Sequence, residues 1–189
     1  DDILRRTVQL VKLHRDTIYR GETDETKAVM PISVIIVTLL TRAYEKLLTE
    51  RAYDFSSPIE VVLELIEMMP SMIALHGGKW YVPNPALPSE NFADRWNDDF
   101  GARAREFGKW HEKLESDLEA LLHQSDRAPR EETIRGVFGP AGVEAWRASK
   151  PNVLNGLLAS AGPAATNPKA PMRAGSSNTL ASGSGRASS

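Results

Sequence analysis

The chain has no cysteine. This absence excludes a disulfide framework, a thiolate nucleophile and a cysteine-based zinc site. A chain without disulfides fits a reducing cytosol, so we expect a cytoplasmic location. Long hydrophobic runs are missing too: the longest, residues 30–40, is shorter than the ~20 residues that span a bilayer. The amino end shows no signal-peptide pattern, and we expect no membrane partner.

An excess of one charge is also missing. The chain has 23 basic and 25 acidic residues, for a formal net charge of -2. Nucleic-acid binders that work by bulk charge are usually strongly basic, so this balance argues against that class. The chain has 189 residues, of which 41% are hydrophobic, and this is enough for one domain of ordinary size with a real core.

Common catalytic motifs are absent as well. There is no glycine-rich phosphate loop and no GxSxG nucleophile motif, and we interpret the pair Gly77-Gly78 as a helix stop. The histidines are scattered, without a pair at ligand spacing. We therefore expect surface or helix-capping roles, rather than metal binding, for His14, His76, His111 and His123.

The stretch that is most apolar runs over residues 30–48 and organises the predicted fold. Its first half is apolar on almost every side, which predicts a segment inside a core. Its valine and isoleucine content also fits a buried strand. An uninterrupted length and a helical spacing of leucines favour one long helix over about 31–52, with Pro31 in its first turn. We predict an all-α bundle around this central helix.

Other helices are predicted from apolar periodicity and from start and stop signals. Ser57, Pro58 and Glu60 form a helix start with a capping box, and Pro70 is expected to kink or end that helix early. The predicted elements are helix 2–20, polar turn 21–29, a helix from 58, an extended half-hairpin near 79–83, loop 83–89, a short helix near Trp96, helix 102–123, and short helices 130–138 and 141–149.

The composition changes near residue 151. Residues 160–189 are mostly Ala, Ser, Gly and Pro. Such a segment buries too little apolar surface to offset its ordering entropy, ~1–2 kcal/mol per residue for the backbone. We predict a helical domain over 1–150 and a disordered tail over 151–189. Because the chain begins without methionine, inside a helical pattern, we interpret it as a fragment of a longer protein.

Two polar residues are candidates for binding a phosphate. Ser33 lies in the first turn of the central helix, where a hydroxyl beside unpaired N–H groups suits a phosphate. The alternative is a local cap or a small residue packed against a neighbour. Lys12 lies off the main apolar stripe of the first helix, and a solvated lysine is the alternative there. If the two helices form a hairpin, both residues come to one end of the bundle. Arg5, Arg6 and Arg15 extend a basic face that either lines the same cleft or is solvated.

Three stretches carry a resemblance to a known family. They are LRRTVQLVKLHRD at 4–16, PISVIIVTLLTRAY at 31–44 and VPNPALPSENFADRW at 82–96. Their order resembles the carboxy-terminal helical lobe of bacterial cyclic-oligonucleotide synthases. These are cyclic GMP-AMP-synthase/DncV-like nucleotidyltransferases of anti-phage defence, within the polymerase-β-like superfamily.

The resemblance implies a two-lobed enzyme with its active site between the lobes. Its amino-terminal lobe would carry a GS motif and carboxylates that bind two Mg²⁺ ions. The helical lobe would close the cleft and hold the donor triphosphate through Lys12 and Ser33. The implied partners are nucleoside triphosphates, the missing catalytic lobe and a regulatory protein.

One part of the family pattern is absent. No GS motif followed by an Asp-x-Asp pair occurs in the chain. We therefore expect this fragment alone to be inactive, with no catalytic residue and no bound metal of its own. Two other interpretations stay open: the equivalent lobe of another polymerase-β-like nucleotidyltransferase, such as one that extends RNA tails, and a helical interaction module without a catalytic role.

Overall fold

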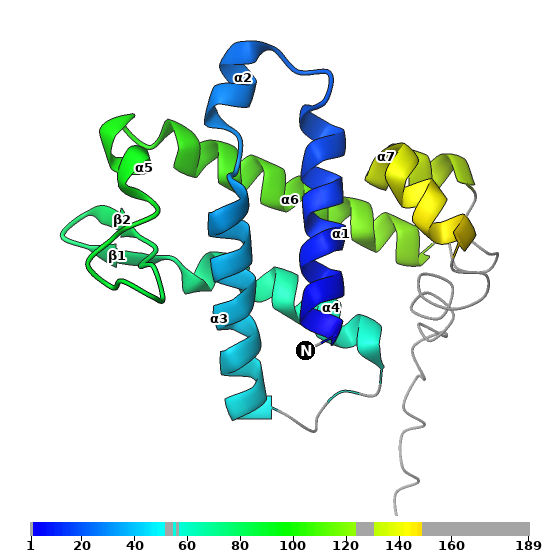
Figure 1. The fold of residues 1–189 in the computed structure, drawn as a ribbon, viewed down its shortest axis with the longest axis horizontal. Helices are drawn as coiled ribbons and strands as arrows, with labels where there is room; N and C mark the ends of the chain where they lie inside the picture. Colours follow the sequence, from blue (N-terminus) through cyan, green and yellow to red (C-terminus); the bar gives the residue numbers. More distant parts are fainter. Residues whose placement is uncertain (1, 52–54, 56, 124–130, 149–189) are drawn as a thin grey trace, which may run out of the picture.

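Helices make up most of the structure, a computed structural model that describes residues 2–51, 55, 57–123 and 131–148 (Figure 1). The predicted all-α class with a short hairpin is confirmed. The tail predicted over 151–189 lies outside the described residues. In chain order the elements are α1 (Asp2–Tyr19), α2 (Asp24–Val29), α3 (Ser33–Arg51), α4 (Pro58–Met68), the 3₁₀ helix η1 (Met69–Met72), β1 (Ala74–His76), β2 (Lys79–Tyr81), α5 (Asp94–Asp98), α6 (Ala102–His123) and α7 (Glu131–Ala148).

The helices α1 and α3 lie side by side and run in opposite directions, with α2 in the connection between them (Figure 1). The prediction of a polar turn over 21–29 was wrong, since α2 is helical. Its start is set by Thr23, whose side chain accepts a hydrogen bond from the Thr26 N–H, and by acidic side chains at Asp24 and Glu25. Both features stabilise a helix amino end. The short α2 thus closes the hairpin of α1 and α3.

The central helix α3 has a buried face and an exposed face. The exposed side chains include Ile32 just before the helix, at 44%, and Val34 and Val37 within it, at 39% and 38%. The prediction that this segment lies inside a core is therefore confirmed for the face that packs with α1, α4 and η1, and wrong for the exposed face. The helix also begins at Ser33, so Pro31 precedes its first turn. Its fully buried residues are Ile35, Ile36, Leu39, Leu40 and Ala43.

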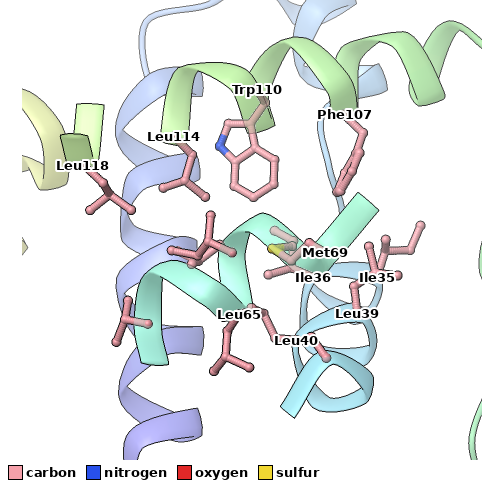
Figure 2. Packing of buried hydrophobic residues seen from close by; sticks show 14 of the residues in the cluster. Ile35, Ile36, Leu39, Leu40, Leu65, Met69, Phe107, Trp110, Leu114 and Leu118 are labelled. Carbon is pink, nitrogen blue, oxygen red and sulfur yellow. The ribbon is translucent and has the colours of Figure 1, made fainter. Parts of the chain in front are cut away.

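The hydrophobic core lies where α6 crosses α3, α4 and α1. Figure 2 shows Phe107, Trp110 and Leu114 of α6 above Leu65 and Met69 of the α4–η1 segment. The Phe107 and Trp110 rings lie 5.8 Å apart between centroids, in a tilted arrangement. Each large side chain that is buried in this way contributes roughly 1.5–3 kcal/mol relative to an exposed one. This packing fixes α6 as the platform on which the α1–α3 hairpin rests.

The start and end of α4 follow the sequence signals only in part. Pro58 is in the first turn, as predicted, and the helix passes into η1 around Pro70, which removes an internal hydrogen bond. The predicted cap at Ser57 is wrong: its side chain makes no capping hydrogen bond. No described side chain or backbone group accepts from or donates to the buried Ser57 Oγ.

A two-stranded hairpin of β1 and β2 follows η1. Gly77 and Gly78 both have positive φ, 58° and 78°, and form its turn. The interpretation of this pair as a helix stop was therefore wrong, whereas the predicted extended segment near 79–83 is confirmed as β2. Antiparallel pairing places Leu75 opposite Trp80. Left-handed backbone at both turn positions is the geometry that glycine allows without strain.

The proline-rich loop after β2 is fixed by two asparagines. The side-chain oxygen of Asn91 accepts from the N–H groups of Val82 and Ala93, at 2.8 and 3.0 Å, and its nitrogen donates to the Trp80 carbonyl. Asn97 on α5 bonds to both the N–H and the carbonyl of Trp80, at 2.9 and 3.0 Å. Much of the stretch 82–96 thus has a structural role, since it clamps the hairpin onto α5.

The last helix, α7, is broken where the sequence predicts a gap between two short helices. Gly139 has a φ of 67° and a ψ of -170°, and Pro140 follows it. The two halves pack on α1, where Gly139 lies against Thr17. Among the described helices, none combines the length and the apolar character that a membrane span requires.

Candidate functional site

Arg15 links α1 to the start of α3. It is only 6% exposed, and its Nη1 donates to the Ser33 hydroxyl oxygen at 2.9 Å and to the Pro31 carbonyl at 3.1 Å. The segment of α1 around residues 12–16 therefore lies beside the amino end of α3, as the predicted hairpin requires.

The rest of the Arg15 guanidinium bonds to its chain neighbour. Its Nε and Nη2 donate to one carboxylate oxygen of Asp16, at 2.9 and 2.6 Å. A buried cation is costly unless it is paired and hydrogen-bonded, and Asp16 supplies that partner. The Asp16 side chain is half exposed, so its negative charge is screened by solvent more strongly than the buried guanidinium is.

Ser33 is partly exposed and does not act as a local cap. The first bond of the helix runs from the Ile36 N–H to the Ile32 carbonyl, at 3.3 Å, so Ile32 holds the capping position. The Ser33 oxygen already accepts from Arg15. A hydroxyl has one hydrogen of its own, which therefore stays available to donate to an oxygen outside. A cationic donor polarises the hydroxyl and strengthens that second bond.

Lys12 lies one helical turn before Arg15 and is partly exposed. Within the described part of the chain it forms no ion pair, and no hydrogen bond joins it to Ser33. Arg15, rather than Lys12, is the residue that contacts Ser33. The prediction that Lys12 and Ser33 act together on a phosphate stays a prediction.

The electrostatics of this junction favour an anion. The amino end of α3 carries the positive end of the helix dipole, and its first amides have no intrahelical acceptor. Arg15 brings a positive charge to this end, and the Asp16 carboxylate neutralises it. The attraction for a further negative group therefore comes from the free amides and the Ser33 hydroxyl, as at other helix amino ends that bind anions.

Sequence reasoning missed the role of Arg15, although a signal was present. The apolar stripe of α1 contains Leu4, Val8, Val11 and Ile18, and position 15 falls on the same stripe. A charged residue at a buried position of a helix calls for a specific partner. Of the two alternatives for the basic face, the solvated one is wrong for Arg15, since this side chain is buried; the cleft alternative stays a prediction.

The other two arginines of the predicted basic face lie away from Ser33. Arg5 and Arg6 pair with Asp2, at 3.0 and 2.5 Å, and their side chains are 72% and 44% exposed. They precede Arg15 by about ten residues, or ~15 Å along a helix. They therefore belong to the opposite end of α1.

The prediction of surface or capping roles was wrong for two histidines. His14 has no exposed surface and bonds to Asp117 on α6, at 3.0 Å. His111 is 5% exposed, and its Nε2 lies 2.7 Å from the Ile66 carbonyl. His76 is exposed, as expected, on β1. The described residues include no group of three His, Cys, Asp or Glu side chains that could hold a metal ion.

A shallow polar cleft of about 480 Å³ lies between the hairpin and α5. It does not include Lys12 or Ser33. Its lining includes His76, Lys79, Tyr81, Ser89, Asp94 and Asp98.

No protein-family model matches the chain, and no curated protein matches it. Function must therefore be argued from the residues.

Proposed function

We propose that this chain is the helical lobe of a nucleotidyltransferase that makes cyclic oligonucleotide second messengers from nucleoside triphosphates in anti-phage defence. The amino end of α3 binds the donor triphosphate in this proposal. The observation that carries it is the contact between Arg15 and Ser33, because it presents a polarised hydroxyl at the positive end of a helix. The resemblance of 4–16, 31–44 and 82–96 to that family supports the same assignment.

Each residue has a separate task in the proposed site. Ser33 donates its hydroxyl hydrogen to a phosphate oxygen, and Lys12 supplies a mobile point charge to the triphosphate. Arg15 is a positioning residue: it holds the Ser33 oxygen and keeps α1 against α3. Binding in this way fixes the reacting phosphate, and such positioning is a large part of catalysis in phosphoryl and nucleotidyl transfer.

Metal chemistry belongs to the other lobe in this proposal. The Mg²⁺ ions that the resemblance implies have no fitting ligand group within residues 2–51, 55, 57–123 and 131–148. We therefore assign no residue of this chain a role in binding metal. The exposed apolar side chains of Ile32, Val34 and Val37 lie beside Ser33, and we assign this surface to contact with the catalytic lobe.

The upstream reading frame tests the proposal most cheaply. We expect the gene to encode, before Asp1, a GS motif followed by an Asp-x-Asp pair. An upstream sequence without these motifs would remove both nucleotidyltransferase interpretations. The exposed apolar face of α3 then favours the interaction module, because large exposed apolar surfaces mark protein contacts.

A further inference from the structure

His14 joins α1 to α6 inside the core. Its Nε2 lies 3.0 Å from a carboxylate oxygen of Asp117, and the ring is fully buried. The Trp110 ring lies beside it, with centroids 6.3 Å apart. This contact connects two helices through residues that are 103 positions apart in the chain.

The surroundings of the two ring nitrogens indicate a neutral imidazole that carries its hydrogen on Nε2. Nε2 faces a carboxylate, so it carries a hydrogen and donates. Nδ1 is buried and has no hydrogen-bond partner among the described residues. A neutral imidazole fits this arrangement, since Nδ1 then bears only a lone pair. A second proton would create a buried donor without an acceptor and a buried positive charge, both of which are costly.

The charges around the ring support the neutral form. Burial lowers the pKa of His14 below its usual value of 6.5, and the hydrogen bond and charge of Asp117 only partly oppose this effect. Lys113, also on α6, pairs with Asp117 and repels a second positive charge on the ring. Both charged groups that shift the pKa of His14, Asp117 and Lys113, lie on α6.

We propose that His14 is an acid-sensitive latch that holds α1 against α6 only while its ring is neutral. The unfolded chain takes up a proton at the histidine as the pH falls below about 6.5, and the folded chain resists it. The contribution of His14 to the stability of the fold is therefore fully present above this pH and is lost as the pH falls below it. Arg15 follows His14 on the same helix, so release of α1 also breaks the contact with Ser33.

The test is the unfolding equilibrium between pH 8 and pH 5, measured in urea for three forms of this chain. His14→Gln keeps an N–H donor for Asp117 and cannot gain a proton. His76→Gln, at the exposed histidine of β1, is the matched control. We expect the unfolding constant of the wild type and the control to rise up to tenfold per pH unit below pH 6.5, as one proton requires. The His14→Gln curve loses that slope.

An unchanged slope in His14→Gln overturns the proposal. Should that variant fail to fold, nitrogen chemical shifts of the wild-type imidazole decide instead. A neutral His14 ring in the folded chain at pH 6 supports the latch. A doubly protonated His14 ring at pH 6, with amide protection of α1 intact, overturns it.

Discussion

Gly101 lies directly against the indole ring of Trp80. A β-carbon at this position would be 2.5 Å from Trp80 Cη2, closer than side chains pack, and Gly101 has a φ of 77°. This contact joins the hairpin to the amino end of α6. It therefore joins the β1–β2 hairpin, the least helical part of the fold, to α6.

Substitution of Gly101 by alanine should destabilise the fold. A left-handed backbone costs an L-residue about 1–2 kcal/mol, and the overlap with Trp80 adds to it, so we expect a loss of roughly 2–4 kcal/mol. The control is Gly108→Ala in the middle of α6, where a β-carbon meets nothing within 4 Å. That change should stabilise by ~0.5–1 kcal/mol. Urea unfolding of both variants measures this, and equal effects would rule out the close contact.

Removal of the Arg15 side chain should weaken the α1–α3 hairpin. Arg15→Ala leaves the Pro31 carbonyl and the Ser33 hydroxyl without their cationic donor, which costs ~1–3 kcal/mol. Arg15→Lys should recover only part of this loss, because an ammonium lacks the planar fork. The exposed Arg5→Ala is the control and should leave urea unfolding unchanged. Equal stability of the Arg15 and Arg5 variants would contradict the link.

The two faces of α3 should respond differently to truncation. Leu40 is fully buried, so Leu40→Ala should cost ~2–5 kcal/mol. Val37 is 38% exposed and should tolerate alanine with a loss below about 1 kcal/mol. Comparable losses at both positions, measured by thermal unfolding, would mean that the exposed face is covered.

Periodicity in the sequence was sufficient to place α1 and α6, since both carry a regular apolar stripe. It could not show which side of α3 is covered. A helix that is apolar on almost every side has no pattern that marks one face, and the neighbours that cover Leu40 and leave Val37 exposed come from elsewhere in the chain.

The candidate site was predictable only in part. Ser33 stood out as a polar residue in an apolar segment, but its partner Arg15 was recognisable only as a charge on an apolar stripe. His14 also falls on that stripe, but nothing local indicated its partner Asp117, which is 103 positions away. Long-range pairs of this kind depend on how helices pack, which sequence spacing does not encode.

Kinetics of the proposed nucleotidyltransferase, expressed from the reading frame with the proposed upstream lobe, test the central claim that the α1–α3 junction holds the donor triphosphate. Lys12→Ala and Ser33→Ala should each lower kcat/KM for the nucleoside triphosphate by ~10- to 100-fold, because each removes an interaction with a charged phosphate worth ~1.5–3 kcal/mol. Lys46→Ala, at an exposed lysine further along α3, is the matched control and should keep wild-type kinetics. Wild-type kcat/KM in both site variants, with unchanged melting temperatures, would contradict the account.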